Sequence, residues 1–84
     1  MPLFMDVHEA LPNGATAEDV ARAHRADLTV QERYGVKYLR YWVDEEAGKF
    51  FCLAEAPSAE AATAVHQQAH GLLAERIYQV REGT

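Results

Sequence analysis

The chain has 84 residues, which is enough for one hydrophobic core and too few for two. Its apolar fraction of 49% is that of an ordinary globular protein, and no run approaches the roughly 20 apolar residues that a membrane-spanning helix requires. A net charge of −5 without a cluster of lysine and arginine argues against nucleic-acid and anionic-lipid partners, since both are bound through dense positive charge.

We therefore expect a single domain over residues 1–84. A domain of this size is marginally stable, and its only cysteine, Cys52, cannot form an internal disulfide. Oligomerisation and metal binding are the remaining ways to stabilise it. The N-terminus lacks the basic start and apolar stretch of a signal peptide, so we expect a cytoplasmic protein.

The first half of the sequence predicts a strand followed by a helix. Residues 3–8 alternate between the two faces of a strand. Thr16, followed three residues later by Asp19, is typical of a helix N-cap with an acidic first turn. The helix should then run to about Arg33, with Gly35 as its left-handed stop.

The second half predicts a hairpin, a helix and a last strand. Residues 36–44 and 49–56 are rich in β-branched and aromatic side chains, and the short turn between them contains Gly48. A Pro-Ser pair ends the hairpin and caps a helix from residue 59 to about residue 74. Residues 77–81 form a short last strand.

The element order β-α-β-β-α-β predicts an α+β fold, the ferredoxin-like βαββαβ sandwich. Right-handed crossovers place both helices on one face of a four-stranded antiparallel sheet. We expect the other face to carry Phe4, Tyr38 and Trp42. An exposed aromatic patch of this size is unusual in a monomer and favours an interface. The prediction is a homodimer packed through the sheet face.

The strongest local signal for chemistry is the pair His66 and His70. Residues four apart lie on one helical face, close enough for two imidazoles to bind one metal ion. The alternative is a pair of histidines at the solvated edge of the core. Gln67 stands where a zinc protease of the H-E-x-x-H type needs its glutamate base, so zinc peptidase activity is not expected.

Other candidate ligands fall at the same edge of the predicted sheet. His8 ends the first strand and Asp44 ends the second, so both can converge with the histidines of the second helix. The alternative for His8 is an exposed residue at a strand end. His24 and Asp27, three residues apart on the inward face of the first helix, form either a structural hydrogen bond or part of a functional site.

Two further residues have competing interpretations. We expect Asp6 on the open sheet face, where it either pairs with Arg40 across a dimer interface or serves as a general base in an enclosed cavity. Cys52, in the middle of an apolar strand, is most simply a small core residue.

Six short stretches, in this order and spacing, resemble a family of small nickel-binding ferredoxin-like proteins: MDVH (residues 5–8), YGVKYLRYW (34–42), FCL (51–53), EAP (55–57), VH (65–66) and AHG (69–71). The resemblance covers nearly the whole chain and implies a homodimer that binds nickel, in a response or storage role. The histidine-bearing motifs of this family fall here on His8, His66 and His70, and its first-helix pattern on His24 and Asp27.

The preferred hypothesis is therefore a metal-binding protein that is not an enzyme, in which His8, His66 and His70 hold Ni²⁺ with help from a carboxylate. His24, Asp27 and Asp44 complete the candidate ligands. Histidine sites bind other divalent transition metals as well, so the sequence does not select the metal.

The alternative hypothesis is a cofactor-free enzyme that acts on a small organic molecule, by analogy with the dimeric ferredoxin-like monooxygenases and isomerases. Its acid–base candidates are Asp6, His24, Asp27 and Tyr38.

Overall fold

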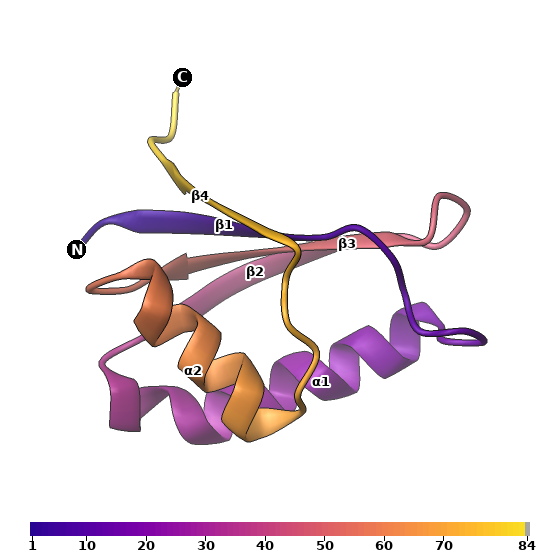
Figure 1. Cartoon of the computed structure of the whole chain (residues 1–84), viewed down its shortest axis with the longest axis horizontal. Helices are drawn as coiled ribbons and strands as arrows, with labels where there is room; N and C mark the ends of the chain where they lie inside the picture. The colour runs from indigo at the N-terminus through magenta and orange to yellow at the C-terminus, as the bar shows by residue number, and fades with distance from the viewer. Residues whose placement is uncertain (84) are drawn as a thin grey trace.

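The computed structural model describes residues 1–83 and contains the predicted elements in the predicted order (Figure 1). The elements are β1 (Leu3–His8), α1 (Ala17–Val30), the 3₁₀ turn η1 (Gln31–Tyr34), β2 (Lys37–Asp44), β3 (Lys49–Glu55), α2 (Ala59–Ala69) and β4 (Arg76–Val80). The strands differ from the predicted ranges by no more than one residue at either end.

The four strands form one sheet in the order β2-β3-β1-β4, and each neighbouring pair is antiparallel. Both helices lie on the same side of this sheet, with α2 crossing near α1 (Figure 1). The predicted ferredoxin-like α+β fold is confirmed.

Helix α1 begins where its sequence predicts. The backbone N–H of Thr16 donates to Oδ2 of Asp19 at 2.9 Å, and the N–H of Ala17 donates to Oε2 of Glu45 at 2.8 Å. Glu45 comes from the β2–β3 turn, so this turn is attached to the start of the helix. Gly35, at φ 69°, ends the helical stretch as expected.

Helix α2 ends at Ala69, five residues before the predicted end at residue 74. Gly71 takes a left-handed conformation with φ 78°, and its N–H donates to the carbonyl of His66 at 2.7 Å. The apolar residues after Gly71 suggested a longer helix. They instead lead through a loop to β4, so His70 is the C-cap of α2.

The prediction for the open sheet face was wrong for Phe4, Tyr38 and Asp6. All three side chains are buried beneath the helices. In β1, the row of Phe4, Asp6 and His8 faces the helices, while the alternate residues face outward. In β2, a bulge explains the error for Tyr38, because Tyr38 pairs with Ala54 and Arg40 with Leu53, which leaves Leu39 as an extra residue.

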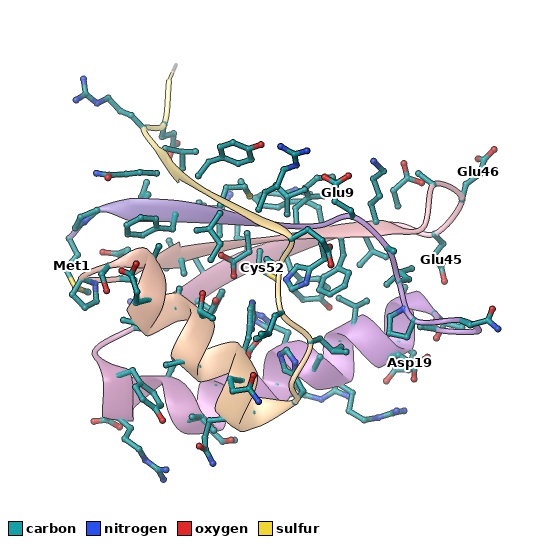
Figure 2. All side chains as sticks on the ribbon, viewed as in Figure 1. Met1, Glu9, Asp19, Glu45, Glu46 and Cys52 are labelled. Carbon is teal, nitrogen blue, oxygen red and sulfur yellow. The ribbon has the colours of Figure 1, made fainter. Side chains whose placement is uncertain are left out.

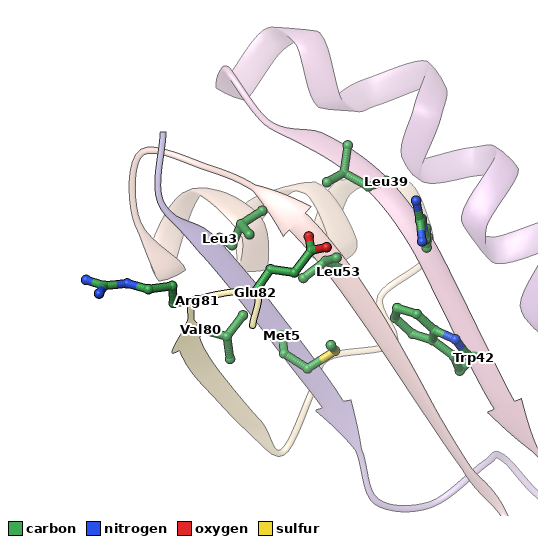
Figure 3. A pocket seen from close by; sticks show the side chains of 9 residues that line it. Leu3, Met5, Leu39, Trp42, Leu53, Val80, Arg81 and Glu82 are labelled. Atoms are coloured by element: carbon green, nitrogen blue, oxygen red, sulfur yellow. The ribbon is translucent and has the colours of Figure 1, made fainter. Parts of the chain in front are cut away.

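The bulge places Tyr38 under the helices and Trp42 on the open face, as predicted for Trp42. Figure 3 shows the resulting apolar groove of about 580 Å³. It is lined by Leu3, Met5, Leu39, Arg40, Trp42, Leu53, Val80, Arg81 and Glu82.

No helix within residues 1–83 combines the length and the apolar character needed to cross a membrane.

Candidate metal centre

His66 lies at the centre of a buried polar network between the sheet and the helices. Its Nδ1 is 2.9 Å from Oδ1 of Asp27, and its Nε2 is 2.7 Å from Oδ2 of Asp6. All three side chains are at most 1% exposed. Because Asp6 comes from β1, Asp27 from α1 and His66 from α2, this hydrogen-bonded chain joins three elements.

Tyr38, from β2, completes one end of the network. Its hydroxyl donates to Oδ2 of Asp6 at 2.6 Å and lies 3.1 Å from Nε2 of His66. Burial, reinforced by the charge of Asp6, raises the pKa of Tyr38 far above its ordinary value. Tyr38 is therefore a fixed hydrogen-bond donor to the carboxylate.

His70 continues the network toward the surface. Its Nε2 lies 2.9 Å from Oδ1 of Asp27, and its Nδ1 accepts the backbone N–H of Leu72 at 3.0 Å. Since Nδ1 accepts a hydrogen bond, Nε2 carries the proton that is donated to Asp27. The side chain of His70 is 12% exposed, so it is the most accessible histidine of this network.

His8 lies on the other side of His66. Its ring stacks on Phe50, with centroids 3.8 Å apart, and meets the His66 ring edge-on at 5.1 Å. The Nε2 atom of His8 is buried and has no hydrogen-bond partner among residues 1–83. Burial, together with the nearby charge of His66, lowers the pKa of His8 to about 4, so the ring is neutral near pH 7.

The charge of His66 is set by its carboxylate partners. Burial by itself disfavours the charged ring, but the hydrogen bonds to Asp27 and Asp6 outweigh this effect and raise the pKa of His66 to about 11. Burial likewise opposes the charge of Asp27, yet hydrogen bonds from His66 and His70 lower the pKa of that carboxyl. The network without metal thus holds an imidazolium between carboxylates.

Two overlapping groups of side chains have donor atoms within 4.8 Å of one another. The first consists of Asp27, His66 and His70, and the second of His8, Cys52 and His66. Imidazole nitrogen, carboxylate oxygen and thiolate sulfur are all ligands of divalent transition metals. Ligands at right angles around an ion with bonds of about 2.1 Å lie about 3 Å apart, close to the 2.9 Å that separates Asp27 Oδ1 from each of its two histidine nitrogens.

The sequence matches the model of a protein family described as the nickel-responsive SCO4226-like proteins over residues 4–80. The chain belongs to this SCO4226-like family. SCO4226 of Streptomyces coelicolor A3(2), whose crystal structure is known, is 39% identical to this chain. The two structures superpose with a TM-score of 0.88, covering 98% of this chain and 99% of SCO4226. The curated proteins include no match.

In this member of the SCO4226-like family, the fold brings together four of the six residues predicted as metal ligands. His8, His66 and His70, called the histidine cluster below, have neighbouring ring centroids 5.1 and 4.9 Å apart. Asp27 bonds to two of these rings.

The other two predicted ligands lie apart from this group. Asp44 is exposed, and its Oδ1 accepts the N–H of Ala47 in the β2–β3 turn at 2.9 Å. The ring centroid of His24 lies 4.8 Å from that of Tyr41. Burial lowers the pKa of His24. Within residues 1–83, neither Asp44 nor His24 belongs to a donor group.

The sequence interpretation did not assign Cys52, Asp6 or Tyr38 to the metal centre: it took Cys52 as a core residue and named Asp6 and Tyr38 only as acid–base candidates of the enzyme alternative. Cys52 lies on the helix-facing side of the sheet (Figure 2). It pairs in register with Asp6 of the neighbouring strand β1. Alternation along β1 already indicated that Asp6 and His8 share a face. The missing information was which face the helices cover.

Proposed function

We propose that this protein binds Ni²⁺ through Asp27, His66 and His70, which meet between the two helices, and acts in nickel response or storage as a homodimer. The observation that carries the proposal is the convergence of His66 and His70 on one oxygen of Asp27, each at 2.9 Å. Membership of the nickel-responsive SCO4226-like family agrees with it.

Asp27, His66 and His70 would hold the ion. Their donor atoms come from two different helices, so a bound ion would connect α1 to α2. Two buried carboxylates, Asp6 and Asp27, lie next to His66 and provide negative charge that favours a divalent cation. Binding would displace ring protons, because the nitrogen that binds a metal must be unprotonated.

The route to the surface would pass His70, which is the partly exposed member of this group. Its Nδ1 is bonded to the backbone of Leu72, at the start of the loop that leads to β4. Movement of this loop would expose the ring without disturbing the sheet.

Calorimetric titration of metal-free protein with Ni²⁺ tests the proposal. We expect His70→Gln to weaken nickel binding by about tenfold or more, since it removes a ligand at a partly exposed position. The matched control is His24→Gln, which removes an imidazole outside both donor groups and should leave the affinity unchanged.

Equal nickel affinity in the His70→Gln variant and the wild-type protein would contradict this site. An equal loss in the His24→Gln control would show that any histidine contributes through the surface or through stability. Circular dichroism of each variant confirms that the fold is retained.

The homodimer is proposed through the open sheet face, with a second copy of this chain as the occupant. The apolar groove on this face carries Arg40 and Arg81 beside Glu82, so two copies related by a two-fold axis can pair opposite charges. A domain of 84 residues also gains stability from burying this surface.

The alternative of a cofactor-free enzyme has no observation in its favour. Of its acid–base candidates, Asp6, Asp27 and Tyr38 bond to one another or to His66, and His24 packs on Tyr41. Within residues 1–83, neither the open-face groove nor the smaller groove beside Gly35 is lined by any of the four. We also propose that the protein is cytoplasmic, a location with which the free, buried thiol of Cys52 is compatible.

A further inference from the structure

Cys52 lies beside the histidine cluster on the sheet side of His66. Its side chain is 3% exposed and points from the middle of β3 toward the helices. Its sulfur, a ring nitrogen of His8 and a ring nitrogen of His66 all lie within 4.8 Å of one another. The thiol therefore belongs to a group of three potential ligands from β1, β3 and α2.

A second observation concerns buried atoms without partners. The Nε2 atom of His8 and the Oδ1 atom of Asp6 are fully buried, and neither has a hydrogen-bond partner among residues 1–83. Asp6 and His8 lie two residues apart on the helix-facing side of β1 and pair with Cys52 and Phe50 of β3. A buried polar atom without a partner is costly, and a native structure that contains one calls for an explanation such as an ion.

We propose that Cys52, His8 and His66 form a second transition-metal position, in which the Cys52 thiolate makes the site suitable for soft or borderline ions. The proposal rests on the nickel function proposed above for the kind of ion and adds a sulfur ligand and a separate position. The ligand type fits Ni²⁺, Co²⁺ and Zn²⁺, whereas Mg²⁺ and Ca²⁺, which prefer oxygen, are excluded.

The binding step is a proton-for-metal exchange without change of oxidation state. Cys52 loses its thiol proton to solvent as the sulfur–metal bond forms. The His66 nitrogen that binds also releases its proton. His8 needs to lose none, because a neutral imidazole already offers one nitrogen lone pair. The charge of Asp6 would balance the cation from the neighbouring position in β1.

Since His66 belongs to both donor groups, the two positions are not independent. The Asp27 group contains oxygen and nitrogen donors only, while the Cys52 group contains sulfur. A thiolate bound to Co²⁺ or Ni²⁺ produces a charge-transfer absorption in the near ultraviolet that imidazole and carboxylate ligands do not. The two positions can therefore be told apart by their spectra.

The test is a titration of full-length, metal-free protein with Co²⁺ and, separately, with Ni²⁺, followed by absorption spectroscopy. We expect the wild-type protein to develop the thiolate-to-metal band. Cys52→Ser and His8→Gln should lose it, and His70→Gln should retain it. Cys52→Ala serves as a second variant if the serine hydroxyl disturbs the core, and circular dichroism confirms that each variant is folded.

The outcomes separate this inference from the proposed function. If calorimetry shows that the wild-type protein binds Ni²⁺ but neither metal produces the band, the Cys52 position is wrong and the nickel function stands. A band that persists in the Cys52→Ser variant also overturns the position. If the wild-type protein takes up neither metal, the proposed function fails and the inference fails with it.

Discussion

His66 is the residue on which the buried network depends. It donates to Asp27 and to Asp6, and its ring lies between those of His8 and His70. Its charge is stabilised only as long as both carboxylates are in place, so the network links protonation directly to folding.

In metal-free protein, this linkage predicts how stability changes with pH. His66 has a pKa of about 11 in the folded state against an ordinary value of 6.5, so its contribution is complete below pH 6.5 and is lost progressively as the pH rises toward 11. His8 has a pKa lowered to about 4 in the folded state. Below pH 6.5, His8 is therefore protonated in the unfolded chain but still neutral in the folded chain, so the free energy of unfolding decreases as the pH falls toward 4. Both effects together place maximum stability near pH 6.5.

Urea unfolding between pH 4.5 and 9, in buffer with chelator, measures this profile. His8→Gln should flatten the acidic side and leave the alkaline side unchanged. Stability that increases steadily from pH 6.5 to 9 would contradict the assignment of His66 as a buried imidazolium.

Tyr38→Phe tests the other end of the network. The substitution removes the hydroxyl that donates to Asp6 at 2.6 Å and leaves a buried carboxylate with one partner fewer. We expect a loss of about 1–3 kcal/mol in the free energy of unfolding. Denaturant unfolding measures it, and Tyr34→Phe in η1, outside the network, is the matched control. Equal effects of the two variants would show that the Asp6 contact contributes nothing specific.

At the scale of single elements, helix α2 is short, and the helix and its C-cap residue supply two of the three clustered histidines. Its N-terminus is held by Ser58, whose Oγ accepts the N–H of Ala61 at 3.1 Å. Its C-terminus is fixed by Gly71. The position of the histidines thus depends on both caps.

We expect Ser58→Ala to reduce stability by about 1 kcal/mol, since it removes the N-cap acceptor. In a domain of this length, the loss corresponds to a fall of about 4–8 °C in Tm. Thermal unfolding by circular dichroism measures it. Ser58→Asp, which restores an acceptor, should regain most of the loss, and a Tm of Ser58→Ala equal to that of the wild type would contradict the role of this cap.

Local signals predicted the elements well where the sequence contains a capping residue, a turn glycine or a regular alternation of side chains. The acidic cap at Asp19, the turn glycines Gly35 and Gly48, and the alternation of residues 3–8 all gave correct boundaries. The predicted end of α2 was wrong because the apolar residues after Gly71 continue a helical pattern. The sequence does not distinguish a glycine that ends a helix in the left-handed conformation, as Gly71 does, from a glycine inside a helix.

The site itself was only partly predictable. The spacing of His66 and His70 indicated one helical face, and the order of elements brought His8 to the same region. The role of Cys52 and the burial of Asp6 and Tyr38 follow from which sheet face is covered. That face is fixed by tertiary packing and by the extra residue Leu39, which no local pattern reveals.

At the scale of the whole molecule, the open sheet face should determine the oligomeric state. We expect the wild-type protein to sediment as a dimer in analytical ultracentrifugation. Trp42→Glu, which places a charge in the lining of the apolar groove, should give a monomer. The matched control is Leu28→Glu on α1, because Leu28 is 43% exposed and Trp42 is 46% exposed.

A monomeric wild-type protein at micromolar concentration would rule out this interface. Dimers that persist in Trp42→Glu would place the contact elsewhere on the molecule. Nickel titration of the Trp42→Glu monomer further shows whether metal binding is confined to one chain, as the two donor groups within a single chain predict.

The bulge in β2 determines which side chains of this strand point toward the helices and which line the open face. With Leu39 present, aromatic residues four positions apart serve opposite surfaces, Tyr38 holding Asp6 in the interior and Trp42 lining the exterior groove. In a relative that lacks this one residue, the side chains on one side of the deletion would point to the opposite face of the sheet. Such a relative would have to give up either the tyrosine at the interior carboxylate or the tryptophan outside, so the length of this strand predicts whether a relative can retain both surfaces.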